Sequence, residues 1–305
     1  MLKLPKAESA EAFDALDEGV LRAGAEELLR ELGVDAAAHR FASGSLPVYA
    51  AGELVLKLFP QVYRSEFPVE TGVLRAIHGQ LPIATPRVTA AGERDGWGFV
   101  LMERMPGTPL TGVWDRIAPG DRDRLADELG TAVAALHALA PPEIDDWWPD
   151  DWDGFVAGQR AGCVDRQRSR GLSEAWLDRI PEALDVDLTD RRRVLLHTEI
   201  MRDHLLVAPG ADGRWRFSGL IDFEPAMRGA PEYEFVGVGC FVAEGDRRFL
   251  GRFLRAYRHP VDDGFPRRMV AWSLLHYFSN LPAWMKRLPP AASFDELAER
   301  WFGVA

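Results

Sequence analysis

The amino-acid sequence predicts an α+β protein made of two unlike parts. The first ~105 residues alternate between helix-like and strand-like segments, whereas most of the chain after residue 121 has the apolar spacing of helices. The segment "PGTPL" at residues 106–110 marks the change between the two parts. With 305 residues, 47% of them hydrophobic, the chain is long enough for one large domain or two modest ones.

The first part is predicted to run as helix, strands, helix and strands. Residues 9–33 have the pattern of one or two helices that end at Gly33. Residues 39–60 alternate in short segments around small-residue turns, which predicts an antiparallel hairpin. The apolar spacing of residues 66–80 predicts a helix, and residues 83–105 predict two more strands joined by a polar turn.

The second part is mostly helical but contains a predicted hairpin. Residues 121–139 predict a long helix, and further helices follow up to about residue 185. Residues 194–207 and 216–223 predict strands on either side of the turn "APGADGRW". Residues 232–302 are helical in pattern and rich in aromatic side chains.

Composition and charge exclude several classes of protein. The net charge is −11 and the pI is about 5.2, opposite in sign to what a binder of nucleic-acid phosphates needs. No apolar run reaches the ~18 residues of a membrane span, and the N-terminus lacks the apolar core of a signal peptide. Cys163 and Cys240 have neither metal-ligand spacing nor the partners of a disulfide framework. We therefore expect a cytoplasmic protein that binds neither nucleic acid nor a membrane, and we expect a monomer.

Four polar side chains stand out in and after the stretch "VLLHTEIMRDHLLV". His197, Glu199 and His204 lie between two apolar runs, and Asp222 ends the apolar strand of "GLIDFEPA". A lone aspartate in that place is usually a turn residue or a helix cap. A strand-loop-strand hairpin, however, brings the loop before its first strand near the end of its second strand. The four side chains therefore predict one shared cleft.

Lys57 marks a second candidate site, because it lies between apolar neighbours in a predicted strand and is costly to bury without a partner. It either faces solvent from a two-sided sheet or pairs with Glu70 of the following helix. Such a pair would fix the ammonium group for an anionic ligand. The preceding loop of Ser43, Gly44 and Ser45 offers backbone N–H groups to phosphate oxygens.

Together and in this order, these segments resemble the aminoglycoside phosphotransferase family, which shares the protein-kinase-like fold. The resemblance covers most of the chain, and "PEYEF" resembles a later structural segment of that family. It implies two lobes. Residues 1–105 would form a small nucleotide-binding lobe with an antiparallel sheet, and residues 106–305 a larger, mostly helical lobe with the catalytic loop and the acceptor site. The linker would lie near residues 102–107.

The resemblance also implies which residues bind the nucleotide. Lys57 would contact the phosphates of ATP, with Glu70 as its partner, and GTP is the alternative nucleotide. Met102 would lie in front of the adenine. The backbones of Glu103 and Met105 would bond the adenine edge.

The predicted catalytic loop departs from the family pattern HGDxxxxN. Glu199 stands in place of the catalytic aspartate, Thr198 in place of the glycine, and His204 in place of the metal-binding asparagine. The change to Glu199 keeps the carboxylate but lengthens the side chain. Asp203 is either a substitute carboxylate or a solvated turn residue.

The resemblance implies that this loop catalyses phosphoryl transfer. Asp222 and His204 would hold Mg²⁺, although hard oxygen ligands suit Mg²⁺ better than imidazole does. Glu199 would orient or deprotonate the acceptor hydroxyl group. His197 would mostly brace the loop through hydrogen bonds.

The stretch "EIDDWWPDDWDGF" at residues 143–155 has two interpretations. It is either a surface loop with buried tryptophans or part of the acceptor site. In the second interpretation Asp146 and Asp151 supply negative potential, and Trp148 and Trp152 stack on a sugar ring or a base.

The implied function is ATP-dependent phosphorylation of a hydroxyl group on a small molecule, such as an aminoglycoside-like, macrolide or nucleoside antibiotic. Two alternatives stay open. Thr198 and Glu199 are compatible with a pseudokinase or small-molecule-binding protein with impaired catalysis. "HTE" also matches two ligands of a non-haem iron oxygenase, with His276 as the distal ligand, but that fold is a β-barrel.

Overall fold

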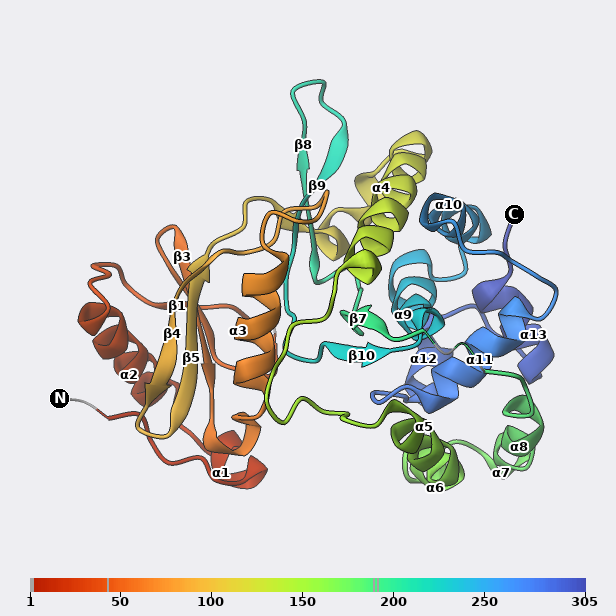
Figure 1. The fold of residues 1–305 in the computed structure, drawn as a ribbon, viewed down its shortest axis with the longest axis horizontal. Coiled ribbons are helices and arrows are strands. Elements are labelled where there is room, and N and C mark those ends of the chain that lie inside the picture. The colour runs from red at the N-terminus through yellow and green to blue at the C-terminus, as the bar shows by residue number, and fades with distance from the viewer. Residues whose placement is uncertain (1–2, 43, 189, 191) are drawn as a thin grey trace.

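The fold has two lobes, which Figure 1 shows side by side in a computed structural model of the protein. The structure describes residues 3–42, 44–188, 190 and 192–305. The N-terminal lobe contains a five-stranded antiparallel sheet with the order β1-β2-β3-β5-β4. Its strands are His39–Arg40 (β1), Val48–Ala51 (β2), Leu54–Phe59 (β3), Val88–Arg94 (β4) and Trp97–Glu103 (β5). Its helical segments are Ala10–Asp14 (α1), Glu18–Glu31 (α2), Gln61–Tyr63 (η1, a 3₁₀ turn) and Glu66–Ile77 (α3).

The side chains of β3 alternate between the two faces of this sheet. Leu56 and Leu58 are buried on the face that α2 covers, whereas Phe59 packs with residues of α3 on the other face (Figure 1). Because neighbouring side chains in a strand point to opposite faces, Lys57 points toward α3. Its side chain is buried there, so the solvent-facing alternative was wrong.

Two tight turns fix the register of this sheet. Asp95 and Gly96 join β4 to β5 with φ angles of 53° and 84°. Both angles lie in the left-handed region that two-residue hairpins require, and an Asp-Gly pair adopts it readily. Gly52, with a φ of 62°, has the same role between β2 and β3. The resulting register places Lys57 opposite Val100 of β5.

The C-terminal lobe consists mainly of helices around a large apolar core. Its α-helices are Pro119–Ala138 (α4), Trp152–Ala161 (α5), Cys163–Ser169 (α6), Glu174–Leu177 (α7), Ile180–Ala183 (α8), Pro231–Gly237 (α9), Arg247–Tyr257 (α10), Phe265–Leu275 (α11), Leu281–Arg287 (α12) and Phe294–Phe302 (α13). Shorter helical segments are Leu110–Gly112 (η2), Trp114–Arg116 (η3) and the π-helix Val238–Ala243 (η4). The predicted bilobal α+β fold is therefore confirmed.

Two small sheets in this lobe bring the candidate catalytic segments together. One consists of Thr108–Pro109 (β6), Leu205–Pro209 (β8) and Trp215–Leu220 (β9), and the other of Val194–Leu196 (β7) and Met227–Gly229 (β10). Antiparallel pairing aligns Leu205 with Leu220, and the Ile221 N–H donates to the His204 carbonyl oxygen over 3.1 Å. The loop after β7 and the segment after β9 therefore lie side by side, as the predicted hairpin required.

The described strands also decide against the iron oxygenase. That alternative needs one sheet closed around the metal ligands, whereas the described strands form an open five-stranded sheet and two small sheets. The oxygenase interpretation was therefore wrong. In the part of the chain that the structure describes, no helix has the length and apolarity needed to span a membrane.

We propose that the junction between the lobes lies at residues 102–107. Gly107, at its end, has a φ of 109°. A Cβ atom there would lie 2.7 Å from the carbonyl oxygen of Val207 in β8. Glycine is needed because the chain passes this close to another backbone in a conformation that favours it.

Candidate active site

A buried cluster of charged groups surrounds the Lys57 ammonium between the lobes. Its Nζ lies 3.0 Å from Glu70 Oε2, so the predicted pair is present. The same nitrogen lies 2.5 Å from Asp222 Oδ1 and 2.7 Å from Glu224 Oε2. Lys57 is 3% exposed and Glu70 is 1% exposed. Because Glu70 belongs to α3 and the other two carboxylates follow β9, the cluster connects the two lobes.

The groups of this cluster shift one another's pKa. Burial lowers the pKa of Lys57, but the three carboxylates outweigh burial and hold it well above its usual value. Burial raises the pKa of Asp222, yet the Lys57 ammonium and His204 hold it well below its usual range. Burial, together with the charge of Asp222, raises the pKa of Glu224 well above its usual range. Asp222 is therefore the ionised carboxylate that can bind a cation.

His197 holds the catalytic loop through both of its ring nitrogens. Nε2–H donates to the Ile221 carbonyl oxygen over 2.9 Å, and Nδ1 accepts from the Glu199 N–H over 3.2 Å. The Glu234 carboxylate of α9 accepts the N–H groups of His197 and Thr198 at 2.6 and 2.9 Å. Burial lowers the pKa of His197, which keeps the ring neutral. With both ring nitrogens engaged, His197 holds the backbone of the loop and has no free nitrogen for proton transfer.

Thr198 has a φ of 70°, in the left-handed region that β-branched residues rarely adopt. Besides the bond from its N–H to Glu234, two more hydrogen bonds hold it there. Its hydroxyl donates to the Pro225 carbonyl oxygen over 3.0 Å, and its own carbonyl oxygen accepts from His276 Nε2 over 3.2 Å. A glycine would adopt this φ without strain, so these contacts offset the cost of having threonine here.

We expect the buried His276 to make the protein less stable in acid. Burial lowers its pKa to about 4, whereas the unfolded chain restores about 6.5. Below pH ~6.5 the unfolded state therefore binds a proton that the folded state does not. Stability should fall until the pH passes about 4, by about 3 kcal/mol in total. Urea unfolding across this pH range measures the loss.

The matched control for this prediction is His276→Gln, which keeps one hydrogen-bond donor and one acceptor but does not titrate. The variant should be less stable at neutral pH and should lose less stability on acidification. Equal pH slopes in the two proteins would contradict the prediction.

Glu199, His204 and Asp222 form a group whose donors fit a divalent cation. One ligand atom of each lies within 4.8 Å of those of the other two. His204 Nδ1–H donates to the Glu199 carbonyl oxygen over 2.9 Å, which directs Nε2 toward Asp222 Oδ2 at 3.0 Å. Burial lowers the pKa of His204, but the two carboxylates raise it more. In the neutral ring the lone pair is on Nε2, where it can meet a metal ion.

The predicted adenine contacts lie at the end of β5. Met102 is buried in the same core cluster as Phe59. The Glu103 N–H donates to the Arg87 carbonyl oxygen over 3.0 Å, so that N–H is not free for an adenine. Within the described residues the Met105 N–H has no acceptor, which leaves it available to a ligand.

The predicted phosphate loop lies between β1 and β2. Gly44 and Ser45 are exposed there, and Gly44 has a φ of 114°. Ser43 lies outside the described residues. The loop therefore stays a predicted phosphate contact.

The acidic aromatic stretch is divided between the core and the surface. Trp147 and Trp152 are buried at 3% and 6% exposure, whereas Trp148 is 49% exposed. The ring of Trp152 packs among the aromatic side chains of the core, so it is not available to stack on an acceptor, and that prediction was wrong. Asp151 caps α5 by accepting the backbone N–H of Asp153, and Asp146 is exposed.

Sequence reasoning missed three acidic residues of the site. Glu224 accepts a hydrogen bond from Lys57, and Glu234 holds the backbone of the candidate catalytic loop. Glu66 of α3 lies close enough for the charges of the cluster to shift its pKa. Burial raises the pKa of Glu66 to about 7. The available signal was the spacing in "IDFEPA", which places Glu224 two residues after Asp222. Asp203 is exposed in the turn before β8, which fits its interpretation as a solvated residue.

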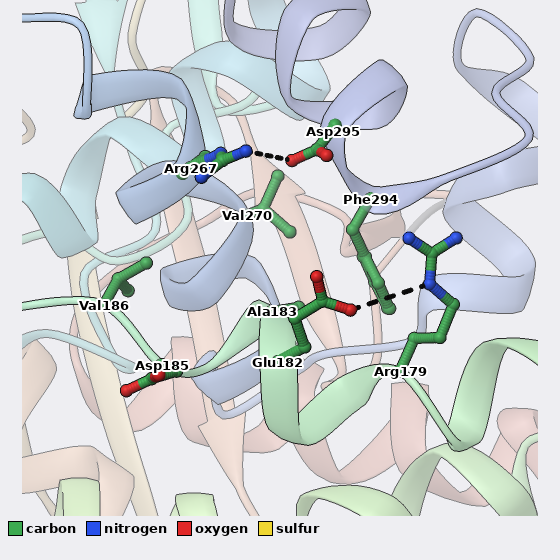
Figure 2. Close-up of a pocket in the computed structure, with 9 residues that line it drawn as sticks. All are labelled: Arg179, Glu182, Ala183, Asp185, Val186, Arg267, Val270, Phe294 and Asp295. Carbon is green, nitrogen blue, oxygen red and sulfur yellow. Dashed lines mark ion pairs between the residues drawn. The ribbon is translucent and has the colours of Figure 1, made fainter.

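A small cavity lies in the C-terminal lobe, between α8, α11 and α13 (Figure 2). Its volume is about 70 Å³. Arg267 and Asp295 form an ion pair of 2.9 Å at its edge. Ligand pockets usually measure roughly 300–1,000 Å³, so this cavity is too small for a nucleotide or an acceptor.

Comparisons with known proteins support the same fold. The sequence profile of the phosphotransferase enzyme family matches residues 38–270. The structure resembles aminoglycoside 2'-phosphotransferase-IIIa in its GDP complex, with a TM-score of 0.69 and 20% identity, covering 91% of this chain and 97% of that chain. It also resembles aminoglycoside phosphotransferase APH(3'')-Id from Streptomyces rimosus in complex with ADP and streptomycin. That match has a TM-score of 0.61 and 19% identity, and covers 84% of this chain and 98% of the other. At these identities the structural likeness shows the shared fold.

One curated relative is a much longer protein. Lysine-specific demethylase JMJ21 from Arabidopsis thaliana is 23% identical over 208 residues. The match covers 54% of this chain and 22% of that protein, so the chain spans about a fifth of the relative's length. The demethylase activity in its name therefore does not transfer to this chain.

Proposed function

The chain belongs to the phosphotransferase enzyme family, and from this premise we propose that it transfers a phosphoryl group from ATP to a hydroxyl group of a small molecule. The observation that carries the proposal is the contact of one buried ammonium, Lys57, with both Glu70 and Asp222. This contact joins an ammonium that would bind phosphate to an ionised carboxylate that would bind a metal ion, across the two lobes. The nucleotide complexes among the structural neighbours agree with it.

The tasks of the transfer can be assigned to separate residues. Lys57 would bind the nucleotide phosphates, and Glu70 would keep its ammonium directed at them. Glu199 would accept the proton of the acceptor hydroxyl, because its carboxylate lies beside the metal-binding group and burial raises its pKa. Met102 and the backbones of Glu103 and Met105 would hold the adenine.

We further propose that Asp222 and His204 hold a divalent cation, for which the family resemblance implies Mg²⁺. Such a cation would neutralise phosphate charge during the transfer. The local charge supports a cation, because Glu66 and Glu199 lie near the site in addition to the carboxylates that contact Lys57.

The imidazole of His204 should give this site a preference for Mn²⁺ over Mg²⁺, since Mn²⁺ accepts nitrogen ligands more readily. The variant His204→Asn restores the family's residue and removes the ring nitrogen. It should weaken Mn²⁺ binding to the ADP-loaded protein by about 10-fold or more and change Mg²⁺ binding less. Electron paramagnetic resonance titration with Mn²⁺, with Mg²⁺ as a competitor, measures both affinities. An unchanged ratio of the two would show that His204 is not a ligand.

The function is tested by incubating the protein with ATP and a set of hydroxylated acceptors that includes kanamycin and streptomycin. We expect ATP consumption that depends on one acceptor, and a product heavier by one phosphoryl group. The acceptor would lie on the C-terminal lobe beside Asp146 and Trp148. The acceptor that the protein phosphorylates then identifies the antibiotic class as aminoglycoside-like, macrolide or nucleoside.

A second candidate is a pseudokinase or small-molecule-binding protein, which the strained Thr198 and the longer Glu199 favour. It predicts nucleotide binding without acceptor-dependent consumption of ATP. Binding measured by calorimetry and turnover measured on the same preparation separate the two candidates.

A further inference from the structure

Three large aromatic side chains form an exposed patch on the C-terminal lobe. Trp148, Tyr277 and Phe278, which we call the aromatic patch, are 49%, 45% and 40% exposed. The ring centroids of Trp148 and Tyr277 are 4.9 Å apart, and those of Tyr277 and Phe278 are 4.8 Å apart. Contiguous exposed apolar groups of this kind mark binding sites more often than isolated ones do.

The aromatic patch is held in position by buried neighbours. The Tyr277 N–H donates to the hydroxyl of the buried Tyr233 over 2.8 Å, and the Phe278 N–H donates to His276 Nδ1 over 3.3 Å. Trp148 rests edge-on against Phe155 at 5.2 Å. A ligand that binds here therefore spends little free energy on ordering the surface.

The same segment touches the catalytic loop. His276, which precedes the patch residue Tyr277, donates through Nε2 to the carbonyl oxygen of Thr198 over 3.2 Å. Thr198 is followed directly by Glu199, the proposed base. The patch segment and the loop of Glu199 are therefore joined through one buried residue, His276.

The charge beside the patch favours a cation. Asp145, Asp146 and Asp150 are exposed, and within the described residues none of them forms an ion pair. The nearest acidic neighbour in sequence that does is Asp153, which pairs with Arg193 over 2.6 Å. These carboxylates lie two or three positions from Trp148 in the chain, and unpaired carboxylates attract a positive charge that can also lie over an aromatic ring.

We infer that the aromatic patch and Asp146 bind an acceptor that combines a flat ring with a protonated amine. This inference rests on the proposed function, since it assigns the substrate class of the same site. The rings of Trp148 and Tyr277 are inclined by 61° to each other, so the ligand ring would stack on one of them and contact the other edge-on. The ammonium group would lie over an aromatic face and near the Asp146 carboxylate.

The test uses three small probes with the same primary hydroxyl group. Phenylalaninol has both a ring and an ammonium group, phenylpropanol has only the ring, and alaninol has only the ammonium group. Their binding to the full-length protein, loaded with a non-hydrolysable ATP analogue, is measured by ligand-observed NMR titration. Phenylalaninol should bind at least about 5-fold more tightly than either of the others. Equal binding of phenylalaninol and alaninol would overturn the inference, because the rings would then contribute nothing.

Variants assign the effect to the patch. Trp148→Ala should lower phenylalaninol affinity about 5-fold and leave alaninol unchanged, and Asp146→Asn should lower the affinity of both amines. Val261→Ala is the matched control, because Val261 is 43% exposed and precedes α11, whereas the patch follows the other end of that helix. Thermal unfolding checks that each variant is folded. Unchanged phenylalaninol binding in Trp148→Ala would sink the inference.

Two further outcomes separate this inference from the proposed function. Phosphorylation of kanamycin with no effect of Trp148→Ala on any acceptor would reject the patch and keep the phosphotransferase. Patch-dependent phenylalaninol binding without turnover of any acceptor would keep the patch and reject the proposed reaction. Light scattering is run in parallel, because a dimer that Trp148→Ala dissociates would make the patch an interface between copies and overturn the inference.

Discussion

Replacing Lys57 with methionine should lower kcat/KM for ATP by about 10²–10³-fold, the size expected when one preorganised cation is removed from developing negative charge. The methionine side chain fills similar space but cannot bind phosphate. Nucleotide affinity should fall together with turnover, because Lys57 would contact the phosphates before and during the transfer. Steady-state kinetics with ATP and calorimetry with ADP measure the two effects.

The same variant should also lose about 3 kcal/mol of stability, because Glu70 is then left as a buried carboxylate without its partner. The double variant Lys57→Met with Glu70→Gln separates the two losses. Removing both members of a buried pair costs less than removing one, so the double variant should regain the part of the thermal stability that the unpaired Glu70 costs, although Asp222 and Glu224 still lack the ammonium. It should not regain activity. Recovery of both would mean that Lys57 only stabilises the fold.

The Lys57–Glu70 pair was predictable because both of its determinants are local. The alternation of side chains along β3 fixes the face of the sheet toward which Lys57 points. The apolar spacing of α3 places Glu70 on the buried side of that helix. Glu224 was not predictable from such patterns. It reaches Lys57 from 167 positions away along the chain, and that contact depends on how the two lobes meet.

The candidate catalytic loop likewise combines contacts that local sequence patterns predict with contacts that depend on tertiary packing. The apolar runs around it predicted β7 and β8, and the hairpin of β8 with β9 brought His204 Nε2 within 3.0 Å of Asp222 Oδ2. The hydrogen bonds that the loop donates to the Glu234 carboxylate depend on how α9 packs against the loop. The residue pattern of the loop does not predict that packing. The positive φ of Thr198 was also not predictable, because such angles are usually recognised in a sequence by a glycine, and this position holds threonine.

The tryptophans of residues 143–155 show that residue type alone does not predict which side chain is buried and which is exposed. Trp148 and Trp152 have the same chemistry and similar acidic neighbours in the sequence. Asp151 caps the start of α5, and the first turn of that helix directs Trp152 into the aromatic core. Trp148 precedes the helix and stays on the surface. The distinction follows from a helix start that lies between them.

Replacing Glu199 with glutamine should lower turnover by about 10²–10⁴-fold while the fold and nucleotide binding persist, since general-base contributions have this size. Glutamine nearly preserves the shape of the side chain but cannot accept the proton. Because the Glu199 carboxylate lies within 4.8 Å of the proposed ligand atoms of His204 and Asp222, turnover must be measured at saturating Mg²⁺ and Mn²⁺. A loss that excess metal reverses would make Glu199 a metal ligand. A loss that persists identifies the base.

Glu199→Asp decides whether the loop is adapted to its longer side chain. Aspartate restores the family's residue but withdraws the carboxylate by one methylene group. The backbone of the loop is held by His197, by Glu234 and by the bond from His204 to the Glu199 carbonyl oxygen, so it cannot follow the shortened side chain. A base must reach within ~2.6–3.2 Å of its proton, and we therefore expect the aspartate variant to be slower than the natural protein. A faster aspartate variant would show instead that glutamate impairs this site, and it would favour the pseudokinase.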